Sequence, residues 1–117
     1  MANNHNNHVG VVVTGVGAVT PLGLTVPATW DAAIQGRSGV GPITLFDTTD
    51  HEMTFAAEVK GFDPSNYLDR REVRRTDRFT QLAIAAAREA LAQAALDTER
   101  PRSDVGVIIG SGIGGID

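Results

Sequence analysis

The sequence predicts an α/β fold in which parallel strands alternate with helices. Two continuous runs of β-branched and aliphatic residues, 9–13 and 105–109, are typical of strands that are buried on both faces. Between them lie two stretches with helical patterns and an irregular excursion. The order strand, helix, excursion, helix, strand favours parallel pairing of the two strands within one domain.

Composition narrows the possible classes of protein. The 117 residues are 42% hydrophobic and 21% charged, as in soluble globular proteins, and no apolar run approaches the ~20 residues of a membrane span. A net charge of −4 gives no general attraction to nucleic acid or to anionic lipid. The absence of cysteine excludes disulfides and cysteine nucleophiles within this chain. We therefore expect neither nucleic-acid nor membrane partners.

The first eight residues are polar and low in complexity, which predicts a disordered tail (1–8) before a single domain (9–117). They lack the basic start and apolar stretch of a secretory signal, so we expect a cytoplasmic protein. His5 and His8 on such a tail make a poor metal site. We expect no metal and no cofactor.

After the first strand, residues 20–23 form a turn signal, and Thr25 is placed to cap a helix that Gly36 ends. That helix carries an apolar face made by Trp30, Ala33 and Ile34. The following segment, 43–59, has mixed signals, with anchors at Phe46, Phe55 and Val59 and a short strand expected around 54–59.

Asp63 followed by Pro64 is typical of a helix start, so we expect a short helical stretch over 66–75. Thr76 is then expected to cap the longest helix, 77–95, whose alanine-rich stripe permits close packing on a sheet or another helix. The stripe consists of Phe79, Leu82, Ala83, Ala86, Ala90, Leu91 and Ala94. A surface loop over 98–104 leads to the second strand.

Three motifs resemble known sites only in part. Residues 14–20 resemble a dinucleotide-binding fingerprint, but Thr20 replaces its third glycine, so a tight structural turn is favoured over nucleotide binding. Ser111 lies between glycines, yet a nucleophile elbow needs glycine where Ile109 stands, which favours an ordinary loop residue. A cluster of potential acid/base groups is interpreted as solvated surface; it comprises Asp47, Asp50, His51 and Glu52.

Although the chain as a whole is acidic, it contains a local cluster of basic residues. Five of the ten basic residues fall between positions 70 and 78, namely Arg70, Arg71, Arg74, Arg75 and Arg78. Their spacing gathers several guanidinium groups on one side of a helical turn, where nearby carboxylates neutralise only part of the charge. An exposed, salt-bridged face and a docking surface for an acidic partner both fit this pattern.

Taken together, several motifs in order closely resemble the amino-terminal region of β-ketoacyl-acyl-carrier-protein synthases, and the type II enzymes most closely. The resemblance covers residues 9–117 and only the start of the family's length. It rests on the segments 11–17, 20–23, 29–30, 36–39, 46–47 and 109–115. It implies a thiolase-like fold of α-β-α-β-α layers, of which the beginning of the first half is present, and a homodimer.

The reaction that the resemblance implies is a decarboxylative condensation of an acyl-enzyme with malonyl-acyl-carrier protein in fatty acid elongation. The family's catalytic cysteine and two histidines lie beyond position 117, and no histidine of this chain matches them, so we assign no catalytic residue here. The resemblance places Ile113, beside Gly112, where type II synthases have an isoleucine that lines and gates the acyl pocket. It also places Arg71, Arg74 and Arg75 where the family meets acyl carrier protein.

Other classes of function fit parts of the sequence. A non-catalytic module or partner subunit that binds acyl carrier protein would use the same arginines without condensing anything. A nucleotide-binding α/β domain would need the fingerprint that the chain lacks. As an amino-terminal fragment of a synthase, the chain alone is expected to be inactive and to aggregate or fold only in part, because its apolar faces would meet solvent.

Overall fold

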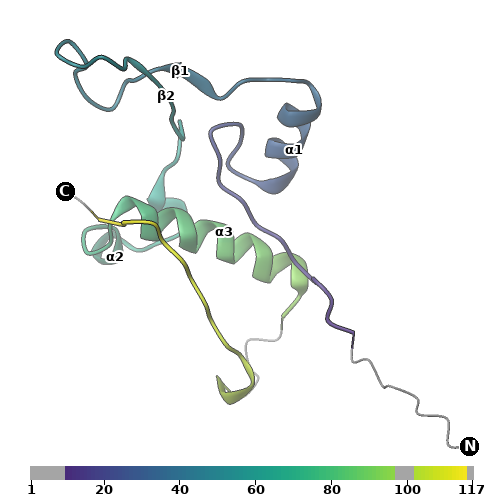
Figure 1. Ribbon diagram of the computed structural model, residues 1–117. Coiled ribbons are helices and arrows are strands. Elements are labelled where there is room, and N and C mark those ends of the chain that lie inside the picture. The colour runs from purple at the N-terminus through teal and green to yellow at the C-terminus, as the bar shows by residue number, and fades with distance from the viewer. Residues whose placement is uncertain (1–9, 97–101, 116–117) are drawn as a thin grey trace, which may run out of the picture.

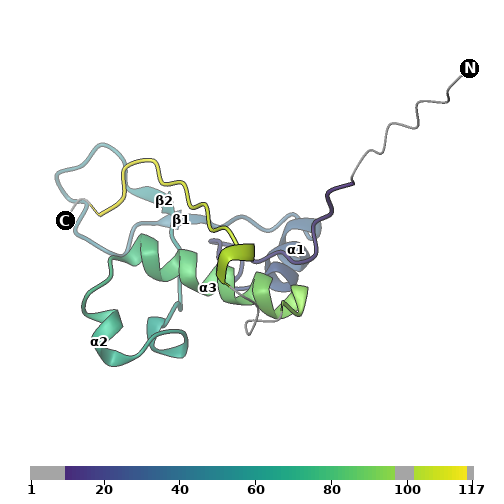
Figure 2. The same ribbon diagram turned by 90° about the horizontal axis from the view of Figure 1, so that it is seen from below.

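The computed structural model describes residues 10–96 and 102–115, and its central element is the helix α3 (Arg78–Ala94). Figure 1 shows α1 (Val26–Ile34) beside the carboxyl-terminal half of α3 and α2 (Arg70–Val73) beside its first turn. The view in Figure 2 shows the same arrangement from below. The expected tail, 1–8, lies outside the described residues, and the division into tail and domain stays a prediction.

Helix α1 begins and ends where the sequence predicts. Thr25 is its N-cap, and the Thr25 hydroxyl accepts a hydrogen bond from the Ala28 amide at 3.3 Å. At the other end Gly36 adopts a φ of +66°, a left-handed conformation that glycine takes without strain, and its amide donates to the Ala33 carbonyl. The predicted apolar face of Trp30, Ala33 and Ile34 is exposed to solvent.

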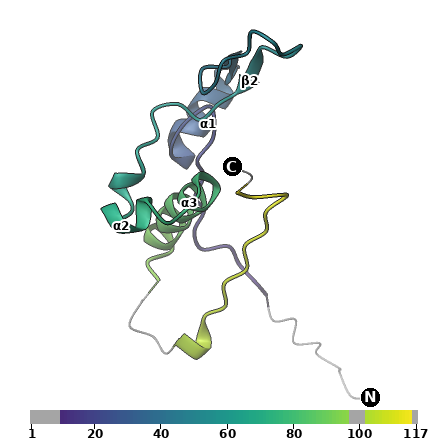
Figure 3. The ribbon, with the colours of Figure 1, turned by 90° about the vertical axis from the view of Figure 1, so that its left-hand side faces the viewer.

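The middle segment forms an antiparallel hairpin of β1 (Val40–Pro42) and β2 (Phe55–Ala57). Val40 pairs with Ala57 and Pro42 with Phe55, and the Ile43 amide extends the pairing to the Thr54 carbonyl. The second strand confirms the strand expected around 54–59, whereas its partner was not predicted. The hairpin projects away from α3 in Figures 1 and 3.

The expected helical stretch over 66–75 is present as two short pieces, η1 (Pro64–Asn66) and α2. The prediction that Thr76 caps α3 is wrong: the N-cap is Asp77. The Thr76 hydroxyl instead donates to the Glu72 carbonyl at 2.8 Å, at the end of α2. The Asp77 side chain makes no capping hydrogen bond to the helix.

The apolar stripe predicted on α3 coincides only in part with the face of the helix that other residues cover. The positions that are buried are Gln81 and Ala85, on a helix that contacts η1 and whose first residue, Arg78, lies over the ring of the core residue Phe62. The alanines at 86, 90 and 94 do pack closely, as predicted, but against an extended segment rather than a sheet or helix. Phe79 and Leu91 are partly exposed.

Neither predicted buried strand forms among the described residues. Val11, Val12 and Val13 belong to no strand and are 95%, 77% and 82% exposed, and Ile108 is fully exposed. A strand in a parallel sheet satisfies its amides and carbonyls only through neighbouring strands, and the described part of the chain brings none alongside 10–13 or 105–109. The exposure of these runs follows from the missing neighbours.

Within the described residues, no helix combines the length and the apolar character needed to cross a membrane.

Candidate functional site

The arginines predicted to dock a carrier lie in the short helix α2, at Arg71, and directly after it, at Arg74 and Arg75. The Asp69 carboxylate accepts from the amides of Arg71 and Glu72, both at 2.8 Å, and the Glu72 carboxylate accepts from the Asp69 amide at 3.0 Å. This capping box holds both nearby carboxylates on the backbone. Arg71, Arg74 and Arg75 are all exposed around it.

A buried glutamine fixes this helix to α3. Gln81 is 8% exposed, and its side-chain amide donates to the carbonyls of Val73 and Thr76 at 3.1 and 2.8 Å. The two carbonyls lie at the end of α2 and in the turn that follows. The patch of exposed arginines is therefore presented by a turn with a defined shape.

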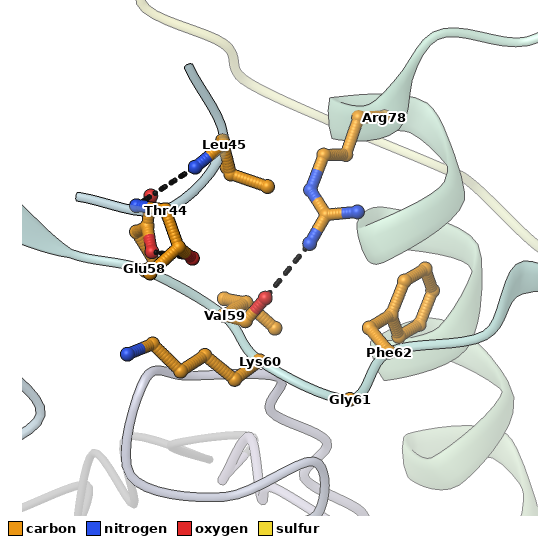
Figure 4. Close-up of a pocket in the computed structure, with 8 residues that line it drawn as sticks. All are labelled: Thr44, Leu45, Glu58, Val59, Lys60, Gly61, Phe62 and Arg78. Carbon is orange, nitrogen blue, oxygen red and sulfur yellow. Dashed lines mark hydrogen bonds between the residues drawn. The ribbon is translucent and has the colours of Figure 1, made fainter. Parts of the chain in front are cut away.

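Arg78 differs from the other arginines of the cluster, because its guanidinium contacts the neighbouring segment 59–62, although the residue is exposed. Its guanidinium donates to the Val59 carbonyl at 2.8 Å and lies 5.8 Å from the centre of the Phe62 ring, a cation–π contact (Figure 4). It lines a pocket of about 390 Å³ together with residues that include Lys60 and Glu58. Because of these contacts we treat Arg78 apart from Arg71, Arg74 and Arg75, which we call the arginine patch.

Glu58 forms the polar wall of that pocket and was not singled out by the sequence. It is 8% exposed, and its carboxylate accepts from the Thr44 amide and hydroxyl at 2.9 and 2.8 Å and from the Leu45 amide at 3.1 Å (Figure 4). The hydrogen bonds from Thr44, aided by the Leu45 amide and the charge of Lys60, lower the pKa of Glu58 despite partial desolvation. The residue ties the two arms of the hairpin together.

The glycine-rich segment that carries Ile113 lies against the first turn of α3. A Cβ built on Gly114 would lie 3.1 Å from Cζ of Phe79, and one on Gly115 would clash with the Asp77 carboxylate. Both glycines have positive φ, +64° and +38°. Ile113 itself is 81% exposed. The structure thus brings the segment that carries Ile113 to the first turn of α3, and Figure 1 shows the described residues up to 115 ending near that turn.

The glycines at 15 and 17 do not form the tight turn that was predicted. The segment 14–19 is extended, and a Cβ on Gly15 or Gly17 would run into the backbone of α3, 2.8 Å from the Ala94 amide nitrogen or the Ala86 carbonyl carbon. These glycines serve a close approach of two backbones. Their faces toward α3 are filled, which removes the space a nucleotide phosphate would need there.

Two side chains of α3 hold this extended segment, and sequence reasoning missed both. The Glu89 carboxylate accepts from the amides of Ala18 at 2.9 Å and Val26 at 2.8 Å, and Gln93 accepts from the Val16 amide at 2.6 Å. Their signal in the sequence is weak: two acceptors, one helical turn apart, on a helix otherwise rich in alanine.

The acidic loop cluster shows local roles only. Asp47 accepts from the amide and hydroxyl of Thr49 at 3.0 and 2.6 Å, and the hydroxyl contact in particular lowers the pKa of Asp47. His51 packs edge-on against Phe46, with ring centres 5.5 Å apart. Ser111 lies beside Gly114 in the loop. These contacts match the surface and loop roles expected for them.

Comparison with known proteins identifies the family of this fold. The family model described as "Beta-ketoacyl synthase, N-terminal domain" matches residues 9–117. The chain belongs to the β-ketoacyl synthase family, in the region of its N-terminal domain.

Among its relatives, the 3-oxoacyl-[acyl-carrier-protein] synthase 2 of Synechocystis is 47% identical over 91% of this chain and 26% of that protein. The protein of the same name from Staphylococcus aureus is 45% identical over 96% of this chain and 27% of its own length. The chain therefore spans about a quarter of the length of the curated relatives it matches. The resemblance inferred from the motifs is confirmed.

A solved structure supports the fold. A chain of the ishigamide ketosynthase/chain length factor superposes with a TM-score of 0.67 at 35% sequence identity, over 81% of this chain and 23% of its own. The α/β, thiolase-like fold class, present here as its beginning, is thereby confirmed, although the two runs expected as its strands are not paired.

Proposed function

We propose that this chain is the amino-terminal part of a type II β-ketoacyl-acyl-carrier-protein synthase that elongates fatty acids. The observation that carries the proposal is the similarity of nearly the whole chain to proteins named 3-oxoacyl-[acyl-carrier-protein] synthase 2. The complete protein would act as a homodimer in the cytoplasm, without a cofactor.

The proposed reaction has two covalent stages. A cysteine thiolate attacks an acyl-carrier thioester, and the carrier thiol leaves. Malonyl-carrier then loses carbon dioxide, and its carbanion attacks the acyl-enzyme thioester, which releases 3-oxoacyl-carrier and regenerates the thiolate. This chain has no cysteine, so the nucleophile would belong to the remainder of the protein. The 117 residues alone would not catalyse the reaction.

We propose that Arg71, Arg74 and Arg75 dock acyl carrier protein in both its acyl and malonyl forms. Their exposure supports this, as does the capping box, which holds the two neighbouring carboxylates on backbone amides. Guanidinium groups suit an acidic partner on a transient interface, where charge mainly raises the rate of association.

Charge reversal tests the docking surface. The double variant Arg71→Glu, Arg74→Glu should weaken carrier binding by about tenfold or more at low salt, with a smaller difference at high salt. Arg88→Glu is the matched control, because Arg88 is also an exposed arginine but lies in the middle of α3. Equal losses in the double variant and in the control would contradict the assignment.

We propose that Ile113 and Gly112 belong to the wall of the acyl pocket. A branched apolar side chain between glycines can swing to admit or block an alkyl chain. The exposure of Ile113 and the open space around Gly112 leave room for that motion.

The test of the whole proposal is condensation by the complete protein encoded with this chain. Acyl-carrier and malonyl-carrier should give carbon dioxide and 3-oxoacyl-carrier in equal amounts. Carrier binding without any product would favour the second candidate, a non-catalytic carrier-binding module or partner subunit. The observation that favours this second candidate is the name of the similar solved structure, which is a ketosynthase together with a chain length factor.

A further inference from the structure

The glycine-rich segment is anchored at one end and open at the other. A Cβ at Gly114 would meet Cζ and Cε1 of Phe79 at 3.1 and 3.3 Å and the Ser111 hydroxyl at 3.2 Å. A Cβ at Gly112 would meet nothing within 4 Å. Ile113 therefore lies between Gly114, which packs against the Phe79 ring, and Gly112, which has open space around it.

The ring that forms this anchor is held by the start of α3. Phe79 is the second residue of the helix, directly after Arg78, whose guanidinium is tied to the Val59 carbonyl. The Asp77 carboxylate, at the N-cap, lies against Gly115 on the same turn. Two adjoining contacts thus fix the backbone just after Ile113, while the side chain of Ile113 is 81% exposed.

We propose that Phe79 is a positioning residue for Ile113, and that by bracing Gly114 it restricts the swing of Ile113 and so sets which acyl chain lengths the site accepts. The inference rests on the proposed function, because it presumes that Ile113 lines an acyl pocket. Phe79 itself touches no substrate in this scheme. It acts through the backbone of Gly114.

The direction of the effect follows from the contact. Removing the ring leaves Gly114, with its positive φ and no side chain, without its support, so that the segment samples more conformations. Ile113 then blocks the pocket less often. Long acyl chains, which must pass it, gain relative to short ones, which do not reach it.

The experiment uses the complete synthase and compares long-chain with short-chain acyl-carrier. Phe79→Ala should raise the ratio of kcat/KM values, long over short, by about tenfold, the discrimination typical of small changes in a hydrophobic pocket. Phe79→Met, which keeps apolar reach, should restore most of the original ratio. Phe55→Ala is the control, an aromatic deletion in the hairpin at a comparably exposed position.

A second variant tests the same contact from the loop. Gly114→Ala places a methyl group against the ring and strains a backbone at φ +64°, so it should also change the ratio. Gly110→Ala, where a Cβ meets nothing within 4 Å, should not. Unchanged ratios in folded Phe79→Ala and Gly114→Ala proteins would overturn the proposal.

Amide hydrogen exchange separates this inference from the proposed function. Phe79→Ala should speed exchange over 111–115, while Phe55→Ala leaves those amides unchanged. Faster exchange and an altered ratio support the positioning role. Unchanged exchange overturns it even when condensation is normal, whereas a wild-type protein that condenses nothing refutes the proposed function instead.

Discussion

Glu89 should be the most important polar side chain for holding the amino-terminal segment on α3. Its carboxylate receives two backbone amides, those of Ala18 and Val26, at 2.9 and 2.8 Å. The second amide belongs to the first residue of α1, where the partial positive charge of a helix start favours a carboxylate. Replacing Glu89 by alanine removes both bonds and leaves two donors without their acceptor.

The magnitude follows from the number and type of these bonds. A hydrogen bond to a charged group contributes about 1.5–3 kcal/mol, and Glu89 is half-buried, so the lower figure applies to each. Glu89→Ala should therefore cost about 3 kcal/mol of local stability. That corresponds to roughly a hundredfold rise in the opening of the segment. Gln93→Ala, which removes one bond to the Val16 amide, should cost about 1 kcal/mol.

Hydrogen exchange of individual amides in the complete protein measures this directly. In Glu89→Ala the amides of Ala18 and Val26 should exchange roughly a hundredfold faster. Arg88→Ala, a change at the exposed neighbour on the same helix, should alter them by about twofold at most. Equal protection in the two variants would contradict this prediction, because the Glu89 carboxylate would then contribute no measurable stability to the segment.

Three further predictions concern other contacts. Gly17→Ala should displace the segment 14–19 and cost about 1–3 kcal/mol, since its Cβ would meet the backbone of Ala86, whereas Gly10→Ala, in open space, should be neutral in the same denaturant titration. Thr44→Val should raise the pKa of Glu58 towards the ordinary value of 4.5, which a carbon-detected NMR titration can follow. Because the folded pKa is lowered, the contribution of Glu58 to stability is present above pH 4.5 and is lost as the pH falls through the folded value; a wild-type titration at or above 4.5 would contradict this. The 117-residue chain made alone should bind hydrophobic dyes and self-associate, and a monomer that melts sharply would refute that expectation.

The helices could be predicted because their signals are local. Thr25 and Gly36 bound α1 through bonds to residues three positions away, and the short helical stretch after Asp63 starts with the cap that its sequence indicates. The misplaced cap of α3 shows the limit of such reasoning. Thr76 and Asp77 are both good capping residues; the helix begins after Asp77, whose side chain makes no capping bond, and the Thr76 hydroxyl donates to the Glu72 carbonyl.

The strands were mispredicted because a strand is not a local structure. The runs 10–13 and 105–109 have the composition of buried strands, but pairing depends on neighbours that the described residues do not provide. Conversely, β1 contains glycine and proline, which weaken any strand signal, and forms because it faces β2 in a hairpin.

For the candidate site, the sequence indicated the exposed residues and missed the supporting ones. The arginine cluster can be recognised as a local run of basic residues, and Ile113 can be recognised as a branched apolar residue between glycines. Their supports are Gln81 and the ring of Phe79, and Glu89 likewise holds the amino-terminal segment; all three look like ordinary residues of an amphipathic helix. Each acts on a backbone outside its own helix, so no spacing within the helix reveals the partner.

The described contacts suggest how the proposed synthase assembles around α3. The segments attached to this helix are joined mainly by amide-to-side-chain bonds and by glycine contacts, and apolar burial is slight, with Ala32, Phe62, Leu68 and Ala85 as the buried apolar residues of the described ranges. Such bonds fix positions but contribute little net free energy, whereas apolar burial supplies most of the stability of a domain. The valines and isoleucines of 11–13 and 105–109 are exposed, and they are the main apolar surface that further strands could bury. Stability of this region should therefore come from the strands that cover those runs, while α3 and its N-cap contact the chain just after each run, at Gly15 and Gly17 and at Gly114 and Gly115.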